Sequence, residues 1–213
     1  AAGSYNTSPF FSINDDGYGM VGVVGFFAGA VDGNSSISNY HSGIFRLTDD
    51  HGSSWSSSGE GDCGYYFIPN EVWGDVIVNH FEDWGDGTGQ DDPDCVEEQF
   101  IVDDMWSYYD LDMKVDANGN PHIVMGGLPG ELDGGTHMFL DQGGWFHFTI
   151  DRDFIDNPGE INTPTGWNWS FVTSMGETWS WNAQDGDTYA WQTQASLGFS
   201  REDPNVVYIV ADK

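Results

Sequence analysis

The chain has 213 residues, of which 35 are acidic and 5 are lysine or arginine, so its formal charge is −30. Such a charge repels phosphate backbones and anionic lipid headgroups, and we therefore expect no nucleic acid and no membrane insertion among its interactions. Aromatic residues make up 15% of the sequence, which provides enough apolar surface for a core and excludes an acidic disordered tail. An acidic surface with almost no lysine favours a secreted or cell-surface protein in saline, cation-rich surroundings.

A membrane-spanning helix is not expected, because the sequence has no run of about eighteen apolar residues. The most apolar stretch, Met20–Val31, is interrupted by three glycines. No basic region precedes it, so it does not have the pattern of a signal peptide either.

Short apolar runs separated by glycine and small polar residues predict an all-β protein, and helical periodicity is nearly absent. The runs are rich in β-branched and aromatic residues: Gly43–Leu47, Val76–Val78, His122–Met125, Trp145–Ile150 and Val206–Val210. Many short strands with frequent turn residues are typical of a sandwich, a barrel or a propeller.

An internal repeat begins near residues 12, 114 and 199. Ser12–Val21 aligns with Lys114–Ile123, and Phe199–Tyr208 is a weaker third copy. In the first two copies an Asn/Asp cluster precedes a glycine, Gly17 or Gly119, which predicts a β-hairpin loop with that glycine at positive φ. The intervals exceed one four-stranded blade of about 40–50 residues, so each holds two blades or one blade with long insertions.

The segment after the first predicted strand matches the pattern [ST]-x-D-x-G-x-[ST]-W at Thr48, Asp50, Gly52, Ser54 and Trp55. This segment resembles the Asp-box, or BNR repeat, of sialidase-like β-propellers. A degenerate copy, Val172–Trp179, has Ser174 in place of the aspartate. The resemblance implies that residues 1–213 form a single propeller domain or most of one, of the kind found in secreted and cell-surface bacterial proteins.

The resemblance also implies a structural role for the Asp-box. Its aspartate accepts backbone and hydroxyl hydrogen bonds, its glycine allows a tight turn, and its tryptophan packs between blades. In that family the turn joins the two outer-middle strands, away from the active-site end.

A catalytic site is not apparent, and no residue is nominated as catalytic. A sialidase would need three arginines around a substrate carboxylate, with a tyrosine nucleophile and a glutamate. The only arginines here are Arg46, Arg152 and Arg201, and their acidic or strand surroundings favour surface ion pairs. A neutral-sugar glycosidase needs two carboxylates, but the sequence singles out no pair. We therefore favour a non-enzyme.

Calcium is the cofactor that the sequence best supports. A glycine-rich acidic loop carries five aspartates with oxygen ligands suited to Ca²⁺: Asp83, Asp86, Asp91, Asp92 and Asp94. The alternative is a long acidic surface loop without a metal. The six histidines lack zinc-like spacing, and no motif for an organic cofactor is present.

Cys63 and Cys95 are the only cysteines. They form one disulfide if the protein is secreted, or remain as two buried thiols.

Tryptophans are concentrated near the C-terminus, where they suit either core packing between blades, which we favour, or stacking on sugar rings. The candidates for stacking are Trp167, Trp169, Trp179, Trp181 and Trp191. Strand alternation places Trp167 and Trp169 on one face.

A closed six- or seven-bladed propeller needs about 250–350 residues, so we expect either part of a longer protein or a small propeller of four or five blades. The predicted function is a non-catalytic extracellular or cell-surface module for adhesion, glycan binding or assembly with other chains. The alternative is a secreted glycan-active hydrolase whose site lies partly outside this chain.

Overall fold

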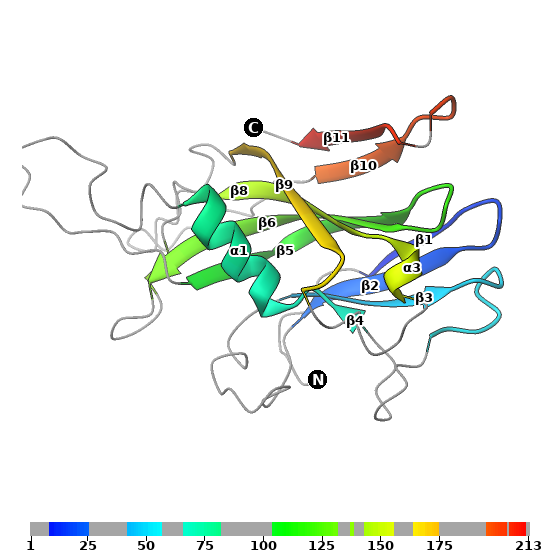
Figure 1. Ribbon diagram of the computed structural model, residues 1–213, viewed down its shortest axis with the longest axis horizontal. Helices are drawn as coiled ribbons and strands as arrows, with labels where there is room; N and C mark the ends of the chain where they lie inside the picture. The colour runs from blue at the N-terminus through cyan, green and yellow to red at the C-terminus, as the bar shows by residue number, and fades with distance from the viewer. Residues whose placement is uncertain are drawn as a thin grey trace, which may run out of the picture.

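The computed structural model describes residues 9–25, 42–56, 66–81, 104–131, 137–138, 143–155, 164–174, 195–203 and 205–211 (Figure 1). This part of the chain is mostly β-strand in antiparallel sheets, none of which closes on itself, so the all-β prediction is confirmed. The strands are β1 Phe10–Ile13, β2 Gly19–Gly25, β3 Ser42–Thr48, β4 Tyr66–Phe67, β5 Asp104–Val115, β6 Pro121–Glu131, β7 His137–Met138, β8 Gly144–Ile150, β9 Trp167–Ser174, β10 Ala195–Phe199 and β11 Val207–Ala211.

Three sheets follow one another along the chain. Sheet A has the order β1-β2-β3-β4, and sheet B has the order β5-β6-β8-β9 with β7 paired to β6. Sheet C consists of β10 and β11. Sheets A and B are therefore meanders, in which each main strand pairs with the next one.

Each copy of the sequence repeat forms the first hairpin of a sheet. The hairpins are β1–β2, β5–β6 and β10–β11, and all three are antiparallel. Gly17 and Gly119 have φ values of 92° and 85°, which confirms the predicted positive-φ positions. Within the described residues, each interval between repeats contains one sheet rather than two.

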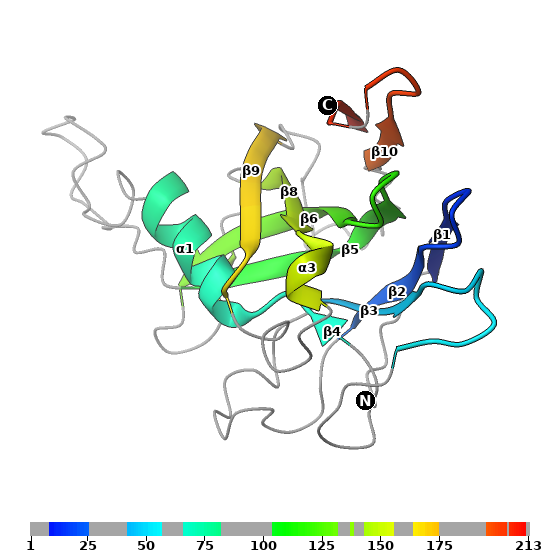
Figure 2. The ribbon, with the colours of Figure 1, turned by 45° about the vertical axis from the view of Figure 1, so that its right-hand side comes forward.

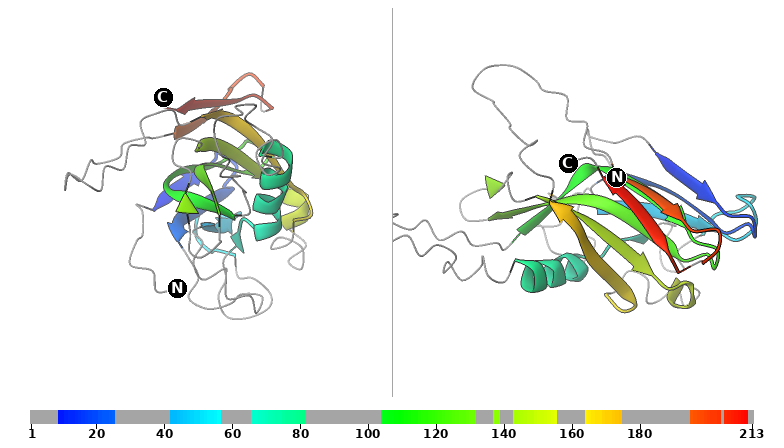
Figure 3. Two further views of the ribbon diagram at one scale, coloured as in Figure 1. Left: turned by 90° about the vertical axis from the view of Figure 1, so that its left-hand side faces the viewer. Right: turned by 90° about the horizontal axis from the view of Figure 1, so that it is seen from above.

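Sheet B lies between sheet A and sheet C (Figures 2 and 3). The larger core cluster joins sheets A and B, with Met20, Phe45 and Leu47 on one side and Met113 and Phe148 on the other. A smaller cluster joins the opposite face of sheet B to sheet C. Strand alternation explains this arrangement, since successive residues of β6 point to opposite faces.

One of the predicted strands is wrong. Val76–Val78 lies in helix α1, Asn70–His80. The β-branched residues of this run favour a strand, and the prediction therefore missed the helix. Val72, Trp73 and Val76 are buried on one side of the helix, and the Trp73 ring lies 4.7 Å from the Phe148 ring of sheet B. Neither α1 nor the short helix α3, Arg152–Ile155, is long and apolar enough to cross a membrane.

Candidate functional site

The turn that resembles an Asp-box joins β3 to β4, the third and fourth strands of sheet A. Asp50 accepts hydrogen bonds from the backbone N–H and hydroxyl of Ser54, at 2.8 and 2.6 Å, and from the hydroxyl of Thr48 at 2.8 Å. The hydrogen bonds from Ser54, followed by that from Thr48, lower the pKa of Asp50 from 3.8 to about 2. Gly52 has a φ of 80°, as a tight turn requires. Every acceptor contact of Asp50 is thus internal to the turn.

The ring of Trp55, in the turn after β3, lies 6.2 Å from the ring of Phe11 on β1. Arg46 lies on β3, opposite Val21 on β2, and its side chain is exposed on the face that points away from sheet B.

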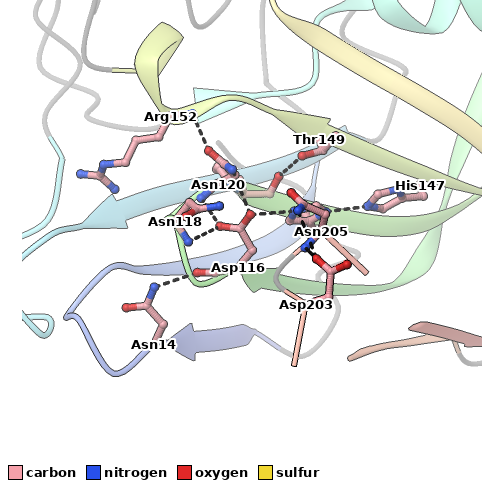
Figure 4. A network of polar contacts seen from close by, with 11 residues as sticks. Asn14, Asp116, Asn118, Asn120, His147, Thr149, Arg152, Asp203 and Asn205 are labelled. Carbon is pink, nitrogen blue, oxygen red and sulfur yellow. Dashed lines mark hydrogen bonds and ion pairs between the residues drawn. The ribbon is translucent and has the colours of Figure 1, made fainter. Parts of the chain in front are cut away.

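The first two repeat turns have the same hydrogen bonds. The side-chain oxygen of Asn14 accepts the backbone N–H groups of Asp16 and Tyr18, both at 3.0 Å. Asp116 accepts those of Asn118 and Asn120, both at 2.8 Å. Figure 4 shows the second turn with the surrounding polar network.

The two turns are also in direct contact. The Asn14 side chain donates to the backbone carbonyl of Asp116 at 2.7 Å. The Tyr18 ring covers Gly119, where a Cβ atom would lie 2.7 Å from Cγ of the ring. The guanidinium of Arg152 lies 4.1 Å from the centre of the same ring.

Arg152 belongs to this network and forms an ion pair, as expected from the sequence, but its side chain is largely buried. Its side chain is only 16% exposed, and its terminal nitrogen is 3.9 Å from the carboxylate of Asp49. Its backbone N–H donates to the side-chain oxygen of Asn120 at 2.9 Å. The residue therefore links α3 to the β5–β6 turn.

Asp116, His122 and His147 form a titratable cluster that the histidine spacing did not reveal. Nδ1 of His122 on β6 is 2.9 Å from Nε2 of His147 on β8, and Nε2 of His122 is 3.7 Å from the Asp116 carboxylate. Burial, followed by the charge of His122, lowers the pKa of His147 from 6.5 to about 4. Burial alone would raise the pKa of Asp116, but hydrogen bonds from His122 and Asn120 outweigh it, and the net pKa is lowered.

Polar contacts between Asp112, Lys114 and Leu197 attach sheet C to sheet B. The carboxylate of Asp112 accepts the backbone N–H of Leu197 at 2.8 Å, and the ammonium of Lys114 donates to the carbonyl of the same residue. Asp112 and Lys114 are themselves 3.1 Å apart. One strand of sheet B therefore holds both backbone groups of one residue of β10.

The two described stacking candidates contribute to the core side of β9. Trp167 is buried, with its ring 6.2 Å from Phe45, so it is not an exposed platform. Trp169 is partly buried, and its indole N–H donates to Asp75 of α1 at 2.7 Å. The remaining candidates lie outside the described residues: Trp179, Trp181 and Trp191.

The calcium and disulfide candidates also lie outside the described residues. They are Asp83, Asp86, Asp91, Asp92, Asp94, Cys63 and Cys95. Within the described ranges, no group of three or more His, Cys, Asp or Glu side chains is placed to hold a metal ion.

Large apolar side chains are exposed at both ends of the three-sheet stack. On the face of sheet C away from sheet B, Tyr208 is 58% and Val210 is 69% exposed. On the face of sheet A away from sheet B, Phe11 is 62% exposed beside its register partner Val21. Inside the stack, the faces that sheets A, B and C turn towards one another are covered by the neighbouring sheet.

Searches with protein-family models, against characterised proteins and against solved structures gave no significant match.

Proposed function

We propose that the chain is a non-catalytic β-propeller module of the sialidase-like, Asp-box type, acting at the cell surface or outside the cell. Its role is assembly with other chains or binding of glycans. The observation that carries this proposal is the pair of apolar end faces around Phe11 and Tyr208.

The order of the sheets supports the propeller part of the proposal. Each sheet begins with the same hairpin, and the sheets stack in chain order with the Asp50 turn between the third and fourth strands of sheet A. Radial repetition of four-stranded meanders produces this arrangement in a propeller. The two outer faces of such a stack need a further sheet, from a later repeat or from a partner chain.

The use of the carboxylates supports a non-catalytic role. Asp50 and Asp116 are engaged by backbone N–H groups of their own turns, and Asp112 by that of β10. These contacts fix loops and strands, so these three carboxylates have structural partners rather than the arrangement that a glycosidase uses. The extracellular setting and a calcium ion at Asp83–Asp94 are further parts of the proposal, based on composition and charge.

The test is sedimentation velocity of the intact chain at about 1 M salt, where the Debye length falls to about 3 Å and repulsion from the −30 charge is screened. We expect concentration-dependent self-association of the wild type through its end faces. The double variant Tyr208→Lys/Val210→Lys should remain monomeric. Val78→Lys is the matched control, because Val78 is 59% exposed but lies on α1, away from both faces.

A wild type that stays monomeric at every concentration would contradict self-association through the end faces. Turnover of any member of a glycan panel by the wild type would overturn the non-catalytic role. Binding without turnover would favour glycan recognition.

A further inference from the structure

The rings of His122 and His147 meet head to head. Their planes differ by only 9°, and their centres are 5.1 Å apart, while the facing nitrogens are 2.9 Å apart. The distance between the ring centres exceeds the distance between the facing nitrogens by about twice the distance from a ring centre to its own nitrogen. Both nitrogens therefore lie close to the line that joins the two ring centres. This is the geometry of a direct N–H···N hydrogen bond rather than of two ligands converging on a metal ion.

A head-to-head pair of this kind depends on its protonation state. A neutral imidazole has one N–H donor and one acceptor nitrogen, whereas a protonated imidazole has two donors and no acceptor. The bond between His122 and His147 therefore requires at least one neutral ring. A second proton would place two N–H groups and two positive charges against each other.

The pair lies where sheet C attaches to sheet B. His122 is buried, and the ring of Phe199 on β10 packs edge-on against it, with the ring centres 5.1 Å apart. On β8, His147 lies two residues after Trp145 and therefore on the same face, and Trp145 belongs to the small cluster shared with sheet C. The two sheets are also joined by the small apolar cluster and by the Asp112–Lys114 clamp on Leu197.

Among the described residues, the charged groups around the pair can balance one proton but not two. Asp116, in the β5–β6 turn, faces only His122, at 3.7 Å. On β5, Lys114 is the register partner of His122 and is already paired with Asp112. No residue of β10 is charged, and the exposed charged residues nearest along the chain lie in the β10–β11 turn: Arg201, Glu202 and Asp203.

We infer that the His122–His147 pair is a pH-sensitive joint that releases the β10–β11 hairpin from sheet B when His147 gains a proton beside His122. Release uncovers the apolar residues that the hairpin now buries, chiefly Val124, Leu128 and Trp145. The low pKa of His147, caused by burial and by the charge of His122, places this event near pH 4. The joint would thus expose the apolar face of sheet B at low pH and keep it covered at neutral pH.

The test is hydrogen–deuterium exchange of the intact chain between pH 7 and pH 4, with labelling times scaled for the intrinsic exchange rate. The reporter is the peptide that contains Leu197, whose N–H is bonded to Asp112. In the wild type we expect its protection to fall by about tenfold or more towards pH 4, while β2 and β3 of sheet A stay protected. The variant His147→Gln, which cannot become charged, should keep the hairpin protected at both pH values.

The control variant is His51→Gln, which removes an exposed histidine outside the pair and should respond to pH like the wild type. Carboxylates such as Asp112 remain in every variant, so their titration cannot produce the difference. If His147→Gln does not fold, His122→Gln is used in its place and its exchange is compared with the wild-type pH profile. Equal loss of protection in wild type and variant, loss in sheet A at the same pH, or full protection of the wild-type hairpin at pH 4 would each overturn the inference.

Discussion

Replacement of Asp116 separates the two roles that its carboxylate has in the β5–β6 turn. One oxygen accepts the backbone N–H groups of Asn118 and Asn120, and the other accepts the Asn120 side chain at 2.9 Å. Asp116→Ala removes both acceptor oxygens and all three hydrogen bonds, whereas Asp116→Asn keeps a carbonyl oxygen for the two backbone groups. Asn14 already performs this function in the first repeat, so the asparagine variant tests whether the two turns are equivalent.

The expected cost follows from the number and burial of the hydrogen bonds. Asp116 is only 4% exposed, and hydrogen bonds to a charged group contribute about 1.5–3 kcal/mol each. Asn118 is exposed, so water replaces part of what the turn loses, and the three bonds are not additive. We expect Asp116→Ala to lower the free energy of unfolding by about 2–4 kcal/mol and Asp116→Asn to lower it by about 1 kcal/mol.

The assay is equilibrium unfolding in urea at pH 7 and fixed salt, followed by tryptophan fluorescence. Comparison of the free energies is valid only if both variants keep the wild-type slope of free energy against urea concentration. Equal destabilisation by alanine and asparagine would show that the charge, and not the acceptor geometry, supports the turn. An alanine variant as stable as the wild type would refute the structural role of the repeat turn itself.

Two further predictions concern the other turns. Gly119→Ala should destabilise the chain by about 1–3 kcal/mol in the same assay, because φ is 85° and the new methyl group would lie 2.7 Å from the Tyr18 ring. Gly198→Ala, where a Cβ would meet nothing within 4 Å, should stay within about 0.5 kcal/mol of the wild type; a similar loss in both would contradict the steric argument. The hydrogen bonds of Ser54 and Thr48 hold the pKa of Asp50 at about 2, below its ordinary 3.8, so its contribution to stability is present above pH 3.8 and is lost as the pH falls towards 2. Thermal unfolding across this range should show a smaller loss for Asp50→Asn than for the wild type, and identical profiles would count against the turn hydrogen bonds.

The turns could be predicted from the sequence because their hydrogen bonds are local. Asn14 and Asp116 each bond to backbone groups two and four residues later, and the glycine of each turn lies within the same five residues. The local sequence of each turn therefore indicates both the side chain that accepts the hydrogen bonds and the glycine with positive φ. The Asp50 turn, likewise, is complete within seven residues, Thr48–Ser54.

Helix α1 could not be predicted in the same way, because its stability depends on packing with distant residues. The run Val76–Val78 has local β propensity, and the helical spacing of Val72, Trp73 and Val76 is visible only over a longer window. Trp73 packs on Phe148, and Trp169 donates to Asp75. Propensity is a weak preference, and tertiary contacts of this kind override it.

The histidine pair was also hidden, because its spacing is set by strand register and not by a sequence motif. His122 and His147 are 25 residues apart and lie diagonally on neighbouring strands, since His122 faces Thr149 and His147 faces Val124. A sequence shows the alternation of each strand but not the register between two strands. Spacing rules for metal-binding histidines therefore miss this pair.

The register also gives a reason to expect that sheet C is the layer most sensitive to pH. Met20 is six residues after Asn14, as His122 is after Asp116, and Phe45 faces Gly22 as His147 faces Val124. The positions that are apolar between sheets A and B are thus histidines between sheets B and C. Fewer buried apolar residues join sheets B and C than join sheets A and B, and polar contacts to Leu197 and the ring contact between His122 and Phe199 supply the rest. An interface with little apolar burial and a titratable pair at its centre should open before the rest of the stack, because regions with few buried contacts have the lowest local stability.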